Sequence, residues 1–307
     1  MRSSKPHAGM RAVVVTSTDV YYPRIVTLVR AEGAQMTPSR VAGEHFLVAL
    51  DRAEEEALMH NSQEVPRPPL ARKAAEMLGL STIHLSRLAD FYLANVGWFR
   101  NQSKSEETPS RLNLYGMRDS MVTGQPNSPN EIRPYVFATR YVTESLLVRL
   151  DHRTVLGRLG LLDNPPSLTG ILNGMGKLAG ASDADKVASV VHSISHAIMR
   201  ALAAEVGLDL TSLGEHMLPT RYAAVIYVKK PYKEPIGLLD HAVRPDVLGR
   251  VLAGAVQILA RCPNDPACAK HPRSSCPACL QLPEITCGFM NRPLGRSQVK
   301  ALFLGGA

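Results

Sequence analysis

The sequence predicts an α+β protein of mixed helices and short strands, followed by a small C-terminal zinc-binding module. Two observations predict the mixed fold. β-Branched and apolar runs at 12–29 and 222–228 are typical of strands, and residues 183–206 repeat apolar side chains with the period of a helix. The third observation is that all five cysteines lie after residue 261, which favours a metal site in that segment.

The composition is that of an ordinary globular protein, with 45% hydrophobic and 20% charged residues among 307. A net charge of +8 favours an anionic partner, such as nucleic acid or an acidic membrane. The chain has no run of eighteen or more apolar residues, and no apolar segment follows the basic N-terminal residues. We therefore expect a cytoplasmic protein that binds neither a membrane nor a small-molecule substrate.

The N-terminal part predicts strands and then helices. Residues 12–29 should form two short strands around a kink at Pro23, because proline cannot donate a ladder hydrogen bond. A helix is expected over 41–61, with the acidic residues 54–56 in solvent. Prolines at 66, 68 and 69 end it.

Two more helices and a loop should follow. One helix begins near Pro69 and ends at Gly79, and another covers 84–97. Residues 101–131 are polar and rich in proline and glycine, which predicts a flexible loop.

The middle of the chain predicts two strands, 135–140 and 142–150, before its clearest helix. Ser182 and Asp185 have the spacing of a capping box that opens this helix, and Gly207 closes it. A strand at 222–228 and a helix at 246–262 then lead into the first cysteine.

These elements suggest three regions. Residues 1–130 form an N-terminal α+β region that ends in the flexible loop. Residues 131–260 form an α+β core that carries the helix with two histidines four apart, and residues 261–307 form the zinc module.

The cysteines follow the pattern C-x5-C-x7-C-x2-C-x7-C. A C-x2-C turn supplies two zinc ligands, and zinc takes four thiolate or imidazole ligands in a closed tetrahedral site. We expect the ligands to be Cys268, Cys276, Cys279 and Cys287. Cys262 or His271 could replace one of them, and the alternative is a set of unconnected thiols. Four protein ligands leave no position for water, so the expected zinc is structural.

The cysteine segment is also basic, which suits contacts with nucleic-acid phosphates or simply a solvated surface. The candidate DNA contacts are Arg261, Lys270, Arg273, Arg292, Arg296 and Lys300.

His192 and His196 lie four apart on the predicted helix, as in the H-E-x-x-H motif of metalloproteases. Ser193 stands where that motif needs its glutamate base. The two histidines, with Arg200 nearby, are therefore expected to form structural hydrogen bonds or a partner interface, with metal binding as a further alternative.

The run GILNGMGKL at 170–178 resembles a phosphate loop only superficially. The Walker pattern requires glycine at 171 and serine or threonine at 178, and the chain has Ile171 and Leu178. We expect no nucleotide hydrolysis.

Several segments together resemble the DrmB-like family, whose members share a C-terminal zinc domain with MrfA-type DNA-repair helicases. They are VVHSISHAIMRALAAEVGLDLTSLGEHM, YAAVIYV, CPNDPAC, SCPACLQLPEITC and NRPLGRSQV, with weaker likeness in TSTDVYYPRIVTLV and ATRYVTESLLVRL. The resemblance implies an accessory subunit of a superfamily 2 helicase, in DISARM-type anti-phage (antiviral) defence or in DNA repair, with one zinc on Cys268, Cys276, Cys279 and Cys287. The chain carries no helicase motor, so a separate subunit would supply ATP hydrolysis.

The expected function is therefore that of a non-enzymatic zinc-binding protein that binds DNA and a helicase partner. One rival is a metal-dependent hydrolase or nuclease that uses His192 and His196. The other is a scaffold that contacts only protein.

Overall fold

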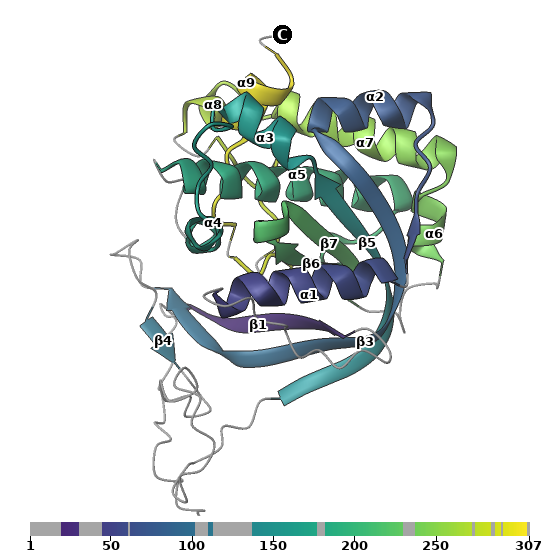
Figure 1. Ribbon diagram of the computed structural model, residues 1–307, viewed down its shortest axis with the longest axis vertical. Helices are drawn as coiled ribbons and strands as arrows, with labels where there is room; N and C mark the ends of the chain where they lie inside the picture. Colours follow the sequence, from purple (N-terminus) through teal and green to yellow (C-terminus); the bar gives the residue numbers. More distant parts are fainter. Residues whose placement is uncertain are drawn as a thin grey trace, which may run out of the picture. The chain divides into compact units, whose positions relative to one another are not determined.

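The computed structural model describes residues 20–30, 45–60, 62–101, 110–112, 137–176, 182–229, 237–271, 274–283, 286–289 and 291–305 (Figure 1). Internal contacts divide the chain into two units. The smaller comprises Met1–Leu28 and Tyr92–Arg140, and the larger comprises Val29–Phe91 and Tyr141–Ala307. The three regions expected from the sequence, with boundaries at 130 and 260, remain a prediction.

The smaller unit contains most of strand β1 (Val20–Arg30), the second half of β3 (Leu80–Asn101) and β4 (Ser110–Leu112). β4 pairs antiparallel with β3, with Trp98 opposite Leu112. β1 is one strand that runs through Pro23, whereas two strands were expected, and residues 12–19 lie outside the described residues. Most of the loop expected at 101–131 also lies outside them.

The predicted helix over 84–97 is wrong, because this segment belongs to β3. The short strand β2 (Ser62–Glu64) pairs antiparallel with residues 84–86, and the backbone N–H of Val65 donates to the carbonyl of Ile83. On the other side, the hydroxyls of Ser86 and Ser145 lie 2.8 Å apart and join β3 to β5. The apolar pattern of residues 84–97 fits either a helix or a strand. Pairing of β3 with strands on both of its edges decides in favour of the strand.

The sheet of the larger unit has the order β3-β5-β7-β6. β5 is a single strand, Phe137–Leu150, where two were expected, and it pairs antiparallel with β7 (Ala223–Val228). β6 (Leu213–Leu218) pairs antiparallel with the other edge of β7. Helices therefore combine with an antiparallel sheet, and the predicted α+β class is confirmed.

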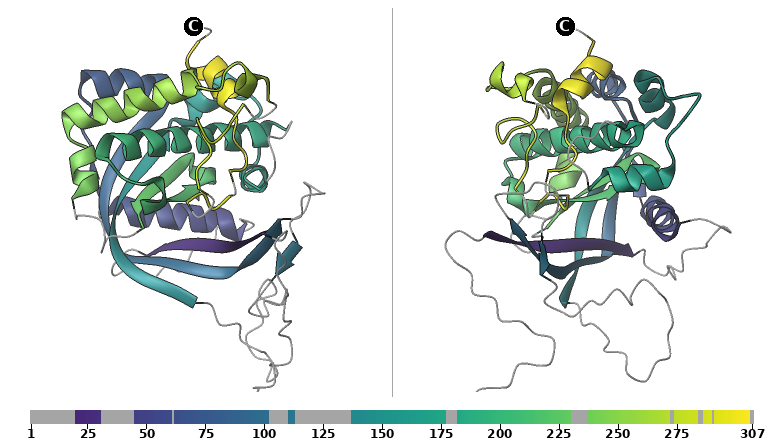
Figure 2. Two further views of the ribbon diagram at one scale, coloured as in Figure 1. Left: turned by 180° about the vertical axis from the view of Figure 1, so that it is seen from behind. Right: turned by 90° about the vertical axis from the view of Figure 1, so that its left-hand side faces the viewer.

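Helix α5 (Asp183–Val206) lies between this sheet and helix α7 (Pro245–Ala260), and α2 (Pro69–Leu78) packs on α7 (Figures 1 and 2). The predicted capping box opens α5, since Ser182 and Asp185 exchange backbone hydrogen bonds, and Gly207 ends it at φ 71°. The remaining helices are α3 (His152–Leu159), α4 (Leu168–Gly174), η2 (Leu210–Ser212), η3 (Pro219–Arg221), α6 (Leu238–Ala242), α8 (Ala267–Lys270) and α9 (Arg296–Phe303).

Among the described residues, α5 has the length and apolar composition of a membrane-spanning helix. However, 89% of the window that meets this test is buried inside the protein. Its apolar character matches its position in the core.

Helix α1 (Phe46–His60) contacts β6 and η3 through acidic side chains. Glu54 accepts a hydrogen bond from His216 at 2.8 Å, and Glu55 pairs with Arg221 at 2.5 Å. Both glutamates are buried, which corrects the expectation that residues 54–56 all face solvent; only Glu56 is exposed.

β6 directs successive side chains to opposite faces. Leu213 and Met217 join the main core, and His216 points the other way, towards α1. Glu215 falls on the same face as Leu213 and Met217, and it contacts α5 there. A buried carboxylate on an apolar strand face is costly unless it is paired, so its partners define the region of interest.

Candidate metal centres

Four cysteines converge where α7 ends. Cys262 follows the last turn of α7, Cys268 lies in α8, and Cys276 and Cys279 lie on one tight turn. Their sulfur atoms are 3.5 Å apart for Cys262 and Cys276, 3.7 Å for Cys268 and Cys279, and 3.8 Å for Cys276 and Cys279. Four thiolates at about 2.3 Å from one zinc would be about 3.8 Å apart, so these four residues, the four-cysteine group, match a tetrahedral site.

The four-cysteine group differs from the expected ligand set at one position. Cys262 belongs to it, and Cys287 does not: Cys287 joins a second group with His192. The spacing allowed either arrangement, because seven residues after Cys279 suffice to reach the same ion. His271 follows α8 at an exposed position and belongs to neither group.

The thiols of the four-cysteine group influence one another. Burial and hydrogen bonds with neighbouring thiols raise the pKa of Cys268 to about 12. Burial also acts to raise the pKa of Cys276, but hydrogen bonds from Cys262 and from the backbone of Ala278 lower it to about 7. A cation that binds here would displace the remaining thiol protons.

Arg296 is a buried cation beside the four-cysteine group. Burial alone would lower the pKa of its guanidinium, but Asp265 and Cys268 raise it. The side chain is only 1% exposed, and it donates to Asp265 at 2.5 Å and to the carbonyl of Ser274 at 3.3 Å. This corrects the expectation that Arg296 contacts DNA, because a side chain this buried cannot reach a phosphate backbone.

The other candidate DNA contacts differ in exposure. Arg261 and Lys270 are exposed and lie next to the cysteines of this group in the sequence. Arg292 and Lys300 are partly buried, and Arg273 lies outside the described residues. A surface groove of about 880 Å³ runs past the end of α7, and its lining includes Arg261, Cys262 and Cys279.

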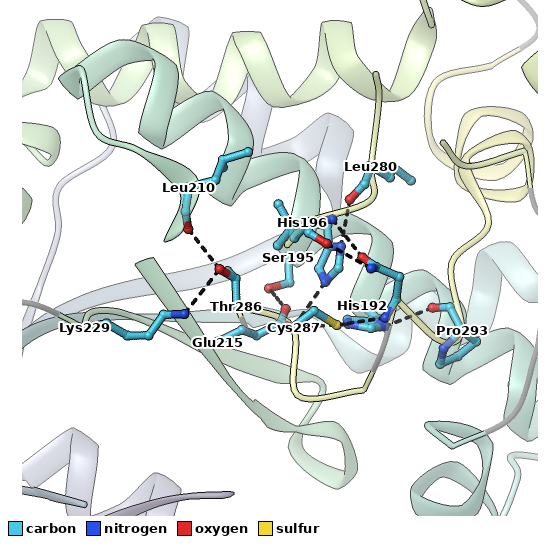
Figure 3. Close-up of polar contacts among 12 residues, drawn as sticks. His192, Ser195, His196, Leu210, Glu215, Lys229, Leu280, Thr286, Cys287 and Pro293 are labelled. Atoms are coloured by element: carbon cyan, nitrogen blue, oxygen red, sulfur yellow. Dashed lines mark hydrogen bonds and ion pairs between the residues drawn. The ribbon is translucent and has the colours of Figure 1, made fainter. Parts of the chain in front are cut away.

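A second group of potential ligands lies in the core, formed by His192, His196, Glu215 and Cys287 (Figure 3). It is called the mixed-ligand group below. The Nε2 atoms of His192 and His196 are 3.1 and 3.3 Å from Glu215 Oε2, and the sulfur of Cys287 is 3.3 Å from His192 Nε2. Both imidazoles are 0% exposed, and Cys287 is 1% exposed.

Hydrogen bonds orient each member of the mixed-ligand group. His192 Nδ1 lies 3.1 Å from the carbonyl of Pro293, and His196 Nδ1 lies 2.8 Å from that of Leu280. A carbonyl only accepts, so each Nδ1 carries the proton and each Nε2 faces the centre. Ser195 donates to Glu215 Oε1 at 2.5 Å (Figure 3).

The charges of the mixed-ligand group are strongly coupled. Burial alone would lower the pKa of His192, but Glu215 and Cys287 raise it to about 10. Burial would raise the pKa of Cys287, but the two imidazoles lower it to about 6, and the same imidazoles hold the pKa of Glu215 well below its usual range.

The expected partner interface at His192, His196 and Arg200 is not an exposed surface. Both histidines are buried and bonded within the chain, which agrees with the alternative of structural hydrogen bonds. Arg200 donates to the carbonyl of Gln281 at 2.9 Å. Ser193, where a metalloprotease would have glutamate, accepts a hydrogen bond from the backbone of Gly295.

Sequence reasoning missed Glu215 and undervalued Cys262. The lone glutamate in the apolar run LGEHML could have indicated Glu215 as a site residue. A carboxylate buried on an apolar strand needs hydrogen-bond or charged partners. Nothing in the spacing of the cysteines distinguished Cys262 from Cys287.

Comparison with protein families agrees with the four-cysteine group. A model of the MrfA Zn-binding domain matches residues 194–280. That stretch contains Cys262, Cys268, Cys276 and Cys279 and ends before Cys287. No curated protein matches the chain significantly.

Proposed function

We propose that this protein is a non-enzymatic, zinc-binding accessory subunit of a superfamily 2 DNA helicase that acts in anti-phage defence or DNA repair. The observation that carries the proposal is the four-cysteine group inside the stretch similar to the MrfA Zn-binding domain. The helicase and its cellular context come from the resemblance of the wider sequence to the DrmB-like family.

The zinc of the four-cysteine group would be structural. Four thiolates satisfy tetrahedral zinc and leave no position for water. Cys262, Cys268 and the turn with Cys276 and Cys279 would be joined to one ion, which fixes α8 and that turn to the end of α7. Thiolate ligands must stay reduced, which fits a cytoplasmic protein.

DNA would bind beside this module. Arg261 and Lys270 are exposed and flank Cys262 and Cys268, so a rigid zinc site would hold two cations at a fixed surface. Contacts of this kind are made to phosphates and carry little sequence preference. A separate helicase subunit would supply ATP hydrolysis and strand separation.

The burial of the mixed-ligand group argues against the rival metal-dependent hydrolase. Hydrolysis requires a metal position open to water and substrate, and all four side chains of this group are buried. Inactivity of the purified protein on DNA with added manganese would agree with the non-enzymatic role, and metal-dependent cleavage that is lost in His192→Ala would overturn it.

Partner binding is tested by affinity purification of the tagged full-length chain from its native cells. We expect a superfamily 2 ATPase to co-purify, and zinc to be present in the same sample. Cys276→Ser should weaken both. If the purified protein contained its full complement of zinc but no ATPase co-purified with it, the helicase assignment would be contradicted.

DNA binding is tested by the dependence of affinity on salt. In Arg261→Ala/Lys270→Ala the slope of log affinity against log salt should become shallower by about 2, because each lost phosphate contact removes about 0.9. Arg250→Ala is the matched control, since Arg250 lies on α7 and is already paired with Glu205 and Asp246. DNA binding that does not depend on salt concentration, or no DNA binding at all, would favour the scaffold that contacts only protein.

A further inference from the structure

The mixed-ligand group has the composition of a metal site, although the proposed function does not use it. It combines two imidazole nitrogens, one carboxylate oxygen and one sulfur, all within 4.8 Å of one another. A metal ion at about 2.0–2.3 Å from four such atoms would hold them about 3.3–3.6 Å apart. Three of the six pairs, His192–Glu215, His196–Glu215 and His192–Cys287, are 3.1 to 3.3 Å apart, which is close to that range.

The hydrogen bonds around the group leave the ligand atoms aimed at its centre. Because Nδ1–H of each histidine donates to the carbonyl of Pro293 or Leu280, a neutral His192 or His196 presents an unprotonated Nε2. Ser195 donates a hydrogen bond to Oε1 of Glu215, which leaves Oε2 directed at the centre of the group. The backbone N–H of Asn291 lies 3.3 Å from the sulfur of Cys287, as expected around a metal-bound thiolate.

Charge balance gives an independent argument. Two neutral imidazoles, a carboxylate and a thiolate carry a charge of about −2, which a divalent cation neutralises. Without a cation the group is neutral only when both imidazoles are protonated, which places four charged side chains together at sites that are 0 to 5% exposed. A divalent cation gives the same charge balance with both imidazoles neutral.

From this geometry we propose that His192, His196, Glu215 and Cys287 bind a second, structural zinc ion. Borderline nitrogen and thiolate ligands in a four-fold set favour Zn²⁺ over Mg²⁺ or Ca²⁺, which prefer oxygen. This ion joins α5 and β6 to the segment after the four-cysteine group. The two sites are adjacent along the chain, since Leu280, which accepts from His196, directly follows Cys279.

The decisive measurement uses the wild-type full chain, purified without chelators. Native mass spectrometry counts the zinc ions, and zinc X-ray absorption reports the average ligands. The proposal predicts two zinc ions per chain with about 2.5 sulfur and 1.5 nitrogen or oxygen ligands on average. One zinc with four sulfur ligands would overturn it, because it would leave the mixed-ligand group as a metal-free charge cluster.

The same data separate this proposal from the zinc of the four-cysteine group. One zinc with a single sulfur ligand would support the second site and contradict the first, and absence of zinc would contradict both. Two variants, compared with wild type by far-UV circular dichroism, sharpen the assignment. Cys287→His keeps a zinc ligand and should retain two ions, with average sulfur lowered to about 2. Cys276→Ser should lose one ion and leave a spectrum dominated by nitrogen and oxygen, and retention of only sulfur ligands in this variant would overturn the second site.

Discussion

Arg296 illustrates how the setting of a single residue determines its role. Its guanidinium is buried between Asp265, the carbonyl of Ser274 and the sulfur-rich surface of the four-cysteine group. Zinc with four thiolates carries a net charge of about −2, and a buried cation next to it lowers the cost of that charge. The residue therefore supports the metal site from inside.

We predict that Arg296→Met lowers the free energy of unfolding by about 2–3 kcal/mol. Methionine fills similar space but leaves Asp265 and the thiolates without their cation, and the partial exposure of Asp265 keeps the loss below that of a fully buried pair. Urea denaturation at constant free zinc measures it. Arg261→Met, at an exposed position, is the control and should change stability by less than about 0.5 kcal/mol. Equal effects for the two variants would show that Arg296 is not buried as described.

At the scale of elements, α1 is joined to its neighbours by polar contacts. Asp51, Glu54 and Glu55 lie on its inner side, and Asp51 accepts hydrogen bonds from the backbone and hydroxyl of Thr220 at 3.0 and 2.7 Å. Burial, in the presence of Glu54, raises the pKa of Asp51 from 3.8 to about 6, although the Thr220 hydrogen bonds oppose it. The contact between Asp51 and Thr220 that holds the helix therefore depends on pH.

This shift sets the direction of a pH effect. The folded protein holds the Asp51 proton more tightly than the unfolded chain, so the contribution of Asp51 to stability falls as pH rises from about 4 to about 6. A roughly hundredfold change in proton affinity corresponds to about 3 kcal/mol. Asp51→Asn keeps an oxygen acceptor for Thr220 and cannot ionise. Relative to wild type, the variant should gain up to about 3 kcal/mol as pH rises through this window.

Urea denaturation of both proteins at several pH values measures the difference, in which zinc effects common to both cancel. Asp163→Asn, in an exposed loop, is the control and should give a flat difference. A flat difference for Asp51→Asn as well would mean that the carboxyl ionises as in water.

The elements also show what local patterns can predict. Caps and periodicity located α2, α5 and α7 to within a few residues, because those signals act within one helix. They failed for β3, which pairs with β1, β2, β4 and β5. They also failed for Glu54 and Glu55, whose partners are His216, Arg149 and Arg221. These contacts join residues far apart in the sequence.

A close contact between β6 and β7 also depends on residues that are distant in the sequence. Gly214 lies opposite Tyr227 of β7, and a Cβ atom there would overlap the tyrosine ring. The glycine thus allows the ring of Tyr227 to lie over β6. The need for glycine at this position follows only from the register between β6 and β7. Which of Cys262 and Cys287 belongs to the four-cysteine group also depends on distant residues. Cys287 lies instead with Glu215 of β6 and the histidines of α5.

At the scale of the larger unit, the two metal groups would act as successive crosslinks. The four-cysteine group connects the end of α7 to α8 and the following turn, and the mixed-ligand group connects α5 and β6 to the segment at Cys287. They differ in access. Cys262 and Cys279 line a surface groove, whereas the second group is enclosed by the core.

This difference predicts that a chelator removes the two zinc ions in separate steps. With a chromogenic chelator in excess, the first ion should leave from the folded protein through the groove, with little change in far-UV circular dichroism. The second should leave only as the protein unfolds, because all four of its ligands are buried, whereas Cys276 of the four-cysteine group is partly exposed. Loss of the first ion should lower the melting temperature by about 10 °C, as expected for about 4 kcal/mol of binding energy. Cys276→Ser should lack the fast step and keep the slow one, and release of both ions at a single rate would contradict the different access of the two sites.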